Sequence, residues 1–477
     1  MRNLTMMTDL YQLTMMYGYY KTNTHNRVAV FDLFFRRSRE DTAYAIAAGL
    51  EQAVDYIENL HFTDEDIQYL RDLALFDEGF LNMLKQIRFT GDIYAVQEGT
   101  VVFPNEPILR VKAPLFEAQL IETALLNIIN HQTLIATKAS KVVHAAQGGK
   151  VLEFGLRRAQ GPDAAIYGAR AAIIGGCSST SNIIAGQMFD VPISGTHGHS
   201  WVMSFADELT AFRAYAEAFP DNCLLLVDTY DTLRSGVPNA IKVFKELKEK
   251  GHKPIGIRLD SGDLAYLSKK ARKMLDDEGF HDAKIVASND LDEYLIWDLK
   301  AQGAKIDIWG VGTSLITSKD NPALGGVYKM AAEEVKGTLV PKIKISENTD
   351  KITLPGYKKV YRIYNTDKKA IADLITLDEE TIDTDKPLTI FDPYDTWKRM
   401  TLTEYTVRQL LEPVYIEGKL QYKKQKLKDI QEYAKRELDS LWEEYKRISK
   451  PHKYKVDLSQ KLYDLKEYLI KEHSFKK

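Results

Sequence analysis

Residues 224–263 read LLLVDTYDTLRSGVPNAIKVFKELKEKGHKPIGIRLDSGD, and this stretch decides the fold class. It opens on a continuous apolar run, which is typical of a buried strand. Apolar residues at helical spacing then predict a helix over 238–250 that ends at Gly251. A second apolar run at 254–259 predicts the next strand. A strand, a helix and another strand in this order predict one βα unit with parallel strands.

The same unit recurs further along the chain. Residues 264–278 and 291–302 have helical spacing, and short apolar runs at 284–287 and 306–309 predict strands. Strands that are separated by single amphipathic helices need right-handed parallel crossovers. The alternatives are therefore a βα barrel and an open doubly wound sheet.

Polar clusters directly follow the predicted strands and favour the barrel. The carboxyl ends of successive strands share one mouth in a barrel, whereas an open sheet would concentrate such residues at one switch point. We therefore expect an irregular α/β barrel over residues 138–342. The clusters are Asp228–Asp231, Arg258–Asp263, Ser288–Asp290 and Gly310–Ser314.

The region before the barrel, residues 1–137, is expected to form an N-terminal α/β domain. Residues 28–35 are strand-like, and residues 93–111 carry further β signals. Residues 117–145 predict one long helix that leads into the barrel.

The region after the barrel, residues 343–477, is rich in Lys and Glu. Apolar residues three or four positions apart from Leu427 to Ile448 predict an amphipathic helix. We expect a charged, partly helical C-terminal extension whose charges mostly face water.

Composition excludes several classes of protein. The chain has 477 residues, of which 44% are hydrophobic and 27% charged, so it can bury a large core. Its net charge of -3 gives no electrostatic reason to expect a nucleic-acid or anionic-membrane partner. Cys177 and Cys223 are the only cysteines, which excludes a disulfide scaffold and a cysteine-built zinc site. No uncharged run is long enough to span a bilayer, and we expect a cytoplasmic protein.

Two clusters could bind a phosphorylated substrate. Gly310–Ser314 places two glycines and two hydroxyl residues after a strand, which suits either a phosphate cradle or a simple tight turn. Arg258 and Asp260 are two positions apart on a strand and so share one face. They could bind an anion and a sugar diol or magnesium, or they could form an internal salt bridge.

Two further segments carry chemistry. In Gly195–Trp201, His197 and His199 would share a strand face, but a metal pair would lack a third ligand. One neutral imidazole could instead act as a base or accept a phosphoryl group, and a histidine that is satisfied in the core is the alternative. Phe154 and Arg157 could stack an aromatic ring and clamp an anion, or form an interface patch.

Together these motifs resemble the nicotinate phosphoribosyltransferases, a type II phosphoribosyltransferase family of NAD salvage. The resemblance covers roughly the first 330 residues. It rests on Thr8–Gln12, Phe31–Arg37, Glu153–Asp163, Gly195–Ser200, Arg258–Asp263 and Gly310–Thr313.

The resemblance implies an ATP-dependent enzyme of ligase or glycosyltransferase type. Such an enzyme forms nicotinate mononucleotide and diphosphate from nicotinate and 5-phosphoribosyl 1-diphosphate. It also implies that nicotinate lies between Phe154 and Tyr11, with Tyr11 supplied by the neighbouring subunit of a homodimer with shared active sites. Arg157 and Arg258 resemble the groups that face the carboxylate or the diphosphate.

Further site residues follow from the same resemblance. Asp228 and Asp260 resemble the groups around the ribose and its Mg²⁺, while Gly312 and Thr313 match the 5-phosphate cradle. His199 matches the histidine that this family phosphorylates with ATP. Its hydrogen-bond partner and any direct protein ligand of Mg²⁺ are not predicted.

The choice of pyridine substrate rests on Asn182 in the resemblance. Related nicotinamide phosphoribosyltransferases carry an acidic residue at the position that aligns with Asn182, where a carboxylate would repel nicotinate. A neutral residue favours the acid over the amide. Two alternatives remain: a nicotinamide phosphoribosyltransferase, and a non-catalytic ligand-binding homologue.

Overall fold

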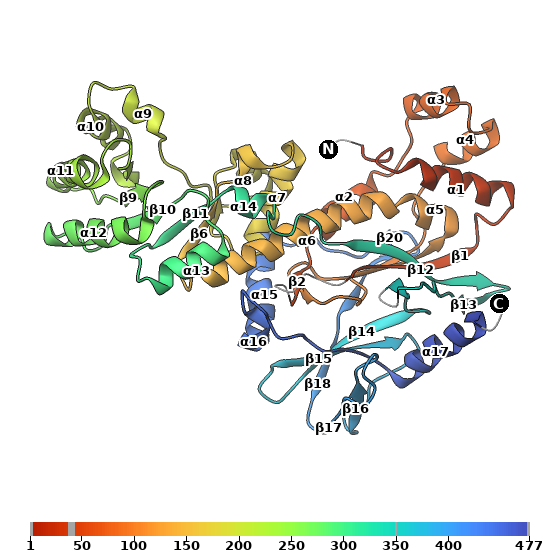
Figure 1. Cartoon of the computed structure of the whole chain (residues 1–477). Coiled ribbons are helices and arrows are strands. Elements are labelled where there is room, and N and C mark those ends of the chain that lie inside the picture. The colour runs from red at the N-terminus through yellow and green to blue at the C-terminus, as the bar shows by residue number, and fades with distance from the viewer. Residues whose placement is uncertain (1–2, 37–42, 349–350, 475–477) are drawn as a thin grey trace. The chain divides into compact units, whose positions relative to one another are not determined.

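The computed structural model describes residues 3–36, 43–348 and 351–474 (Figure 1). It divides into two compact units. The inserted unit is Ile135–Pro322, and the outer unit combines the described residues up to Leu134 with those from Ala323 onward. The chain thus leaves the outer unit, builds the inserted unit and returns.

The inserted unit is built on a six-stranded sheet, and every pairing in it is parallel. Its strand order is β7-β6-β11-β10-β9-β8. Strands that follow one another in the chain are also neighbours in the sheet, except β7 and β8. In addition β6, the first of these strands in the chain, pairs with β11, the last. The strands are β6 (Lys150–Glu153), β7 (Ser179–Thr180), β8 (Leu224–Leu226), β9 (Gly256–Leu259), β10 (Lys284–Ala287) and β11 (Ile308–Val311).

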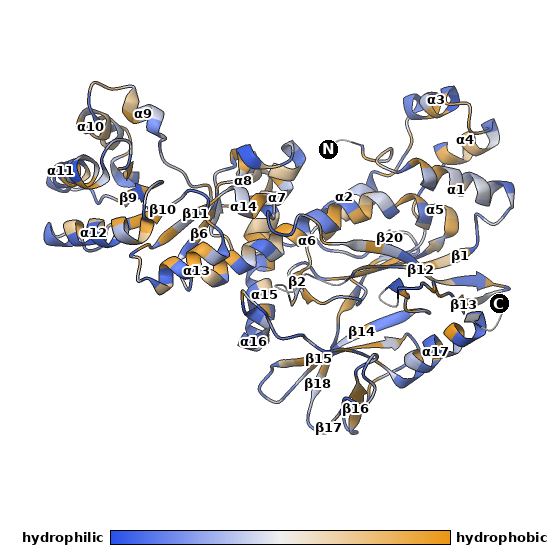
Figure 2. Cartoon of the chain, viewed as in Figure 1, coloured by the Kyte–Doolittle hydropathy of each residue, from blue (hydrophilic) through white to orange (hydrophobic). Residues whose placement is uncertain are grey.

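The predicted crossover helices are confirmed to within three residues at each end as α11 (Val237–Glu249), α12 (Leu264–Asp277) and α13 (Glu293–Ala301). In α11 and α12 buried apolar side chains recur at helical spacing, whereas α13 buries Glu293 together with Ile296 and Leu299 and exposes Leu295 and Trp297. Figure 2 shows both hydrophobic and hydrophilic residues on α11 and α12. The remaining helices of this unit are α7 (Pro162–Ile174), α8 (Ile183–Phe189), α9 (His199–Met203), α10 (Glu208–Ala218) and α14 (Thr313–Ile316).

The gap in the cyclic strand order lies between β7 and β8, which do not pair. Residues 192–197 contact the strands on both sides of it. On one side Ser194 donates its N–H to the Thr180 carbonyl at 2.9 Å. On the other side the N–H of Leu226 donates to Nε2 of His197 at 3.2 Å. The six strands are therefore parallel, and an irregular segment, residues 192–197, bonds to both β7 and β8, which do not pair with each other.

The outer unit contains a seven-stranded sheet in the order β13-β12-β1-β5-β3-β19-β20. The predicted strand at 28–35 is confirmed, and 93–111 yields three strands. The strands of this sheet are β1 (Val28–Phe35), β3 (Asp92–Val96), β5 (Leu109–Pro114), β12 (Gly326–Val335), β13 (Thr338–Pro341), β19 (Leu411–Ile416) and β20 (Lys419–Leu420). A short ladder joins β2 (Ala45–Ile46) to β4 (Val101–Val102).

Helices surround the apolar core of the outer unit. The core joins strands to helices through Leu33, Ile57, Phe80, Val111 and Val414. The predicted long helix is two helices that meet at Ile121, and the second is divided between the two units. The helices are α1 (Leu10–Lys21), α2 (Leu50–Glu58), α3 (Asp64–Asp72), α4 (Glu78–Lys85), α5 (Leu115–Leu120) and α6 (Glu122–Ala145).

The C-terminal extension is partly helical, as expected, but strands that the sequence did not predict make up much of it. A four-stranded sheet contains β14 (Lys358–Tyr364), β15 (Ala370–Leu377), β18 (Thr406–Gln409) and β21 (Val456–Leu458), beside a hairpin of β16 (Leu388–Phe391) and β17 (Arg399–Leu402). Strand β19, which also belongs to residues 343–477, pairs with β3 in the sheet of the N-terminal strands. Residues 343–477 are therefore not a separate layer of structure. The helices are α15 (Leu427–Ser440), α16 (Glu443–Lys446) and α17 (Gln460–Ser474), and the predicted helix over 427–448 is interrupted at Leu441.

Some charges of this region are buried rather than solvated. Arg362 is fully buried and bonds to Asp373 at 2.7 Å and Glu437 at 2.9 Å. Lys358 is also fully buried and pairs with Asp32 at 2.7 Å. These pairs fix β14 against its neighbours, because an isolated buried charge would be strongly destabilising.

None of the helices in the described ranges combines the length and the apolar character needed to cross a bilayer.

Candidate functional site

The carboxyl ends of neighbouring strands bring two predicted carboxylates together. Oδ2 of Asp228, which follows β8, accepts hydrogen bonds from the N–H of Asp260 at 2.7 Å and the hydroxyl of Ser261 at 2.6 Å. Asp260 follows β9, the next strand of the sheet. The two loops are thus joined through the Asp228 carboxylate.

Arg258 lies on the same face as Asp260, as the spacing predicts. Its Nη2 donates to Asp260 Oδ1 at 2.9 Å, and its Nε donates to the hydroxyl of Ser288 at 2.8 Å. Ser288 in turn donates to Asp260 Oδ1. Burial raises the pKa of Asp260, but the Ser288 hydrogen bond, the Arg258 charge and His199 together bring it below its ordinary value. Asp260 is therefore an ionised carboxylate at neutral pH.

His199 lies beside these carboxylates. Its Nε2 is 3.6 Å from Asp260 Oδ2, and its Nδ1 is 3.2 Å from the hydroxyl of Thr229. Thr229 therefore supplies the ring partner that the sequence did not identify. The His199 side chain remains 39% exposed, so a ligand can reach it.

His197 has a different environment, and the expectation that both histidines lie on one strand face is wrong. The segment before His199 is irregular, and His199 begins the short helix α9. His197 is buried, accepts from the N–H of Leu226 and packs edge-on against Tyr215. Burial, together with the charges of Arg258 and His199, lowers the pKa of His197 to about 4, although a contact with the Gly198 carbonyl acts the other way.

Phe154, Gly310 within β11 and Gly312 directly after it form one wall of the site. A Cβ on Gly310 would lie 2.7 Å from the Phe154 ring, so only glycine leaves room for the ring there. A Cβ on Gly312 would lie 3.1 Å from the Phe154 carbonyl oxygen. The Arg258 guanidinium is 5.9 Å from the ring centroid. Thr313 follows, half-buried, as the first residue of α14.

Glu153 is a site-supporting residue that sequence reasoning missed. It is fully buried at the end of β6 and accepts hydrogen bonds from the Thr180 hydroxyl at 2.6 Å and from the N–H of Gly155. Burial raises its pKa, and these two hydrogen bonds act in the opposite direction. The signal was present in the sequence, because an acid ends an otherwise apolar strand. Glu153 anchors the turn that carries Phe154.

The other predicted residues do not join this cluster. Asn182 is fully buried and caps α8, accepting from the N–H of Ala185 at 3.3 Å and donating to the Ala165 carbonyl at 3.2 Å. Its amide is occupied by backbone groups, which is a different role from the predicted contact with substrate. Arg157 is exposed in a short 3-10 turn beside the Phe154 turn.

Tyr11 belongs to the outer unit and is 48% exposed on α1. Burial, followed by Glu122 and Asp9, raises its pKa to about 12, so its phenol stays protonated. Arg37, the last residue of one quoted motif, lies outside the described residues.

Among the residues that the structure describes, no three His, Cys, Asp or Glu side chains are grouped closely enough to hold a metal ion. Asp228 nevertheless has one buried carboxylate oxygen, Oδ1, without a hydrogen-bond partner in the described part of the chain. A free carboxylate oxygen fits Mg²⁺, which binds through one or two carboxylates plus substrate phosphates.

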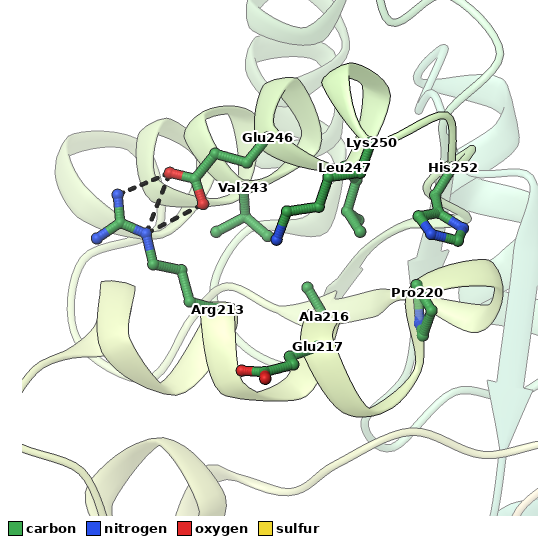
Figure 3. Close-up of a pocket in the computed structure, with 9 residues that line it drawn as sticks. All are labelled: Arg213, Ala216, Glu217, Pro220, Val243, Glu246, Leu247, Lys250 and His252. Atoms are coloured by element: carbon green, nitrogen blue, oxygen red, sulfur yellow. Dashed lines mark hydrogen bonds and ion pairs between the residues drawn. The ribbon is translucent and has the colours of Figure 1, made fainter.

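A separate cavity of about 320 Å³ lies between α10 and α11 (Figure 3). Arg213 and Glu246 pair across one end of it at 2.7 Å. At the other end His252 bonds to Asp221 at 2.8 Å. None of the predicted site residues is among those that line it.

Comparison with known proteins gives one consistent family. Residues 6–130 match the nicotinate phosphoribosyltransferase N-terminal domain, 149–367 the nicotinate phosphoribosyltransferase family and 357–466 the C-terminal domain of the same enzyme. The chain is 53% identical to the nicotinate phosphoribosyltransferase of Bacillus subtilis (strain 168), over 98% of this chain and 96% of that protein. It is 33% identical to the Homo sapiens nicotinate phosphoribosyltransferase, over 96% and 95%.

Solved structures agree. The crystal structure of human nicotinic acid phosphoribosyltransferase matches with a TM-score of 0.84 and 31% identity, over 97% of this chain and 99% of that one. A nicotinate-nucleotide pyrophosphorylase from Pyrococcus furiosus shares the fold, with a TM-score of 0.70 and 22% identity over 92% and 96%.

The environment of His197 predicts a pH dependence of stability. In the unfolded chain His197 binds a proton below its ordinary pKa of 6.5, whereas in the folded protein it binds that proton only below about pH 4. The free energy of unfolding should therefore fall by about 2 to 3 kcal/mol from this group as the pH drops through that window. His197→Gln keeps an acceptor for Leu226 and should lose this part of the pH dependence in urea unfolding. His281→Gln, at an exposed histidine, is the control and should retain it.

Proposed function

Because the chain belongs to the nicotinate phosphoribosyltransferase family, we propose that it forms nicotinate mononucleotide and diphosphate from nicotinate and 5-phosphoribosyl 1-diphosphate in NAD salvage. The observation that supports this best is the cluster at the strand ends. There Asp228 and Asp260 meet beside Arg258, His199 and the Phe154 ring. The cluster combines an aromatic wall, a cation and two carboxylates within one part of the inserted unit.

Binding of nicotinate would use the aromatic wall and the cations. Phe154 offers a ring face for the pyridine, and Gly310 keeps the space beside that ring clear. Arg258, and the exposed Arg157 near the same turn, would attract the nicotinate carboxylate or the diphosphate. Asn182 is a helix cap, so the preference for the acid over the amide rests on these cations.

The reaction joins the pyridine nitrogen to the anomeric carbon as the bond from that carbon to the diphosphate breaks. Positive charge develops on the ribose in an oxocarbenium-like transition state. Asp228 and Asp260, held in place by the hydrogen bonds between their loops, would stabilise that charge without reorganising. Arg258 would take up negative charge on the leaving diphosphate.

Mg²⁺ would be held by Asp228, through its unpartnered oxygen, and by Asp260. When bound, the ion would supply neutralisation of the diphosphate charge. The 5-phosphate would lie at Gly312 and Thr313, where a backbone without a Cβ and a hydroxyl follow β11.

ATP coupling would run through His199. Attack of one imidazole nitrogen on the γ-phosphorus forms an N–P bond and releases ADP, and water later cleaves that bond to give phosphate. Thr229 and Asp260 lie at the two ring nitrogens, so they can fix the ring orientation that the attack needs. This would provide the phosphohistidine implied by the resemblance.

We also propose that the inserted unit forms an irregular βα barrel and that the protein is cytoplasmic. Residues 192–197 would close the cyclic strand order into an irregular barrel, because they bond to β7 and to β8. Cys177 and Cys223 are both buried, and a chain with two cysteines has no disulfide scaffold, which suits the reducing cytoplasm.

We also propose a homodimer with shared active sites. The face of α1 that carries Leu10, Tyr11 and Met15 exposes apolar side chains by 53%, 48% and 39%. In the inserted unit Ile183 and Met188 of α8 are 72% and 46% exposed. Apolar surfaces of this kind are usually covered by a partner, and a second copy is the partner that the resemblance implies.

The activity is tested by mixing the protein with 5-phosphoribosyl 1-diphosphate, Mg²⁺ and either nicotinate or nicotinamide. Diphosphate release should be faster with nicotinate, by roughly 100-fold or more in kcat/KM. A preference for nicotinamide would assign the amide-specific activity instead. Absence of release with both would indicate a non-catalytic binding protein.

The role of His199 is tested by His199→Ala. This variant should lose stimulation by ATP while it keeps a reduced, uncoupled transferase activity, because the ribose-binding carboxylates remain. His281→Ala, at an exposed histidine, is the matched control and should behave as wild type. Normal ATP stimulation in His199→Ala would contradict the assignment.

Shared sites predict complementation between defective subunits. Tyr11→Ala and Asp260→Asn should each inactivate the homodimer, in different halves of each site. After the two variants are mixed and allowed to exchange subunits, about a quarter of wild-type activity should return, because half of the dimers then carry one intact site. If no activity returns although subunit exchange is verified, Tyr11 does not act across a dimer.

A further inference from the structure

Ser288 lies between the two charged groups that the reaction would use. It follows β10 directly and is 3% exposed. Its oxygen accepts from Arg258 Nε at 2.8 Å, and its hydrogen is donated to Asp260 Oδ1. A hydroxyl has one hydrogen and two lone pairs, so Ser288 can serve the cation and the carboxylate at the same time.

We propose that Ser288 is a positioning residue for the transferase reaction, which fixes the Asp260 carboxylate against the Arg258 guanidinium. The inference rests on the proposed function. With Oδ1 bound by both Ser288 and Arg258, Oδ2 is left as the oxygen that faces His199. Ser288 therefore determines which oxygen of Asp260 is available in the site.

The turn after Ser288 supports this role. Asn289 has φ 91° and Asp290 has φ 26°, so two consecutive non-glycine residues lie in the left-handed region. Such a backbone conformation costs free energy and persists where surrounding contacts hold it. Ser288, the residue directly before Asn289 and Asp290, bonds to Arg258 and Asp260 and is one of the contacts that hold this turn.

Loss of the hydroxyl would leave two neighbours without a partner. The groups that face the Asp260 carboxylate are Arg258 from β9, Ser288 directly after β10 and His199 from α9, while Asp228 from the β8 loop holds its backbone N–H. Without the hydroxyl, Asp260 Oδ1 loses one of its two hydrogen bonds and Arg258 loses the partner of its Nε. Both groups are then less firmly oriented in the site.

The test is Ser288→Ala in the full-length enzyme, with kcat and KM measured for nicotinate and the melting temperature measured beside them. We expect kcat to fall about 10- to 100-fold with little change in KM. Ser288→Thr keeps a hydroxyl and should restore most of the wild-type kcat. Ser268→Ala is the matched control, because Ser268 is fully buried and has two hydrogen bonds, to Ala265 and from Lys305.

The outcomes are distinguishable. A wild-type protein that releases no diphosphate refutes the proposed function itself. An active wild type together with a Ser288→Ala variant that keeps kcat, and loses only melting temperature, overturns the positioning role alone. The same holds if kcat falls equally in the Ala and Thr variants, or if Ser268→Ala lowers it as much.

Discussion

The in-register parallel pairing of β8, β9 and β10 is the constraint on which the site depends. Arg258 lies opposite Leu226 of β8 and Val286 of β10. Side chains two positions apart share a face, and a slip of one residue would turn them to the other face. The residues two positions further along these strands are Asp228, Asp260 and Ser288. One register therefore assembles the carboxylates and the hydroxyl from three segments of the chain.

The two carboxylates are stabilised by different means. Asp260 has a guanidinium and a hydroxyl on one oxygen, whereas Asp228 relies on a backbone N–H and the hydroxyl of Ser261. Arg258 pairs with Asp260, so Asp228 is the carboxylate of the two that is bonded only by neutral groups. In the proposed function, both carboxylates would hold the cation, and the buried, unpartnered Oδ1 of Asp228 would be the oxygen with no protein hydrogen bond to give up.

The sequence was sufficient where hydrophobic burial decides structure, and insufficient where a polar contact does. Apolar runs located β8, β9, β10 and β11 of the inserted unit, but not the short strands β6 and β7, and the polar ends of the located strands gave Asp228 and Asp260. The hydrogen bond between Thr229 and His199 joins the loop after β8 to the start of α9, so no local spacing in the sequence predicts it. Strand β14 was missed because its buried Arg362 reads as a solvated charge until its acidic partners are known. Asn182 was assigned to the substrate from an alignment with related enzymes, and such an alignment does not report that its side chain also caps α8.

The return of the chain to the outer unit has a consequence for synthesis on the ribosome. Strand β1 pairs with β5 early in the chain, but its other edge waits for β12, where Ala29 lies opposite Glu333. Strand β3 waits longer still, for Leu411 and its neighbours in β19. The inserted unit is made of local βα pieces and can fold while those edges stay open. The first strands to be translated are thus among the last to be completed, and until then their unpaired edges need protection from other nascent chains.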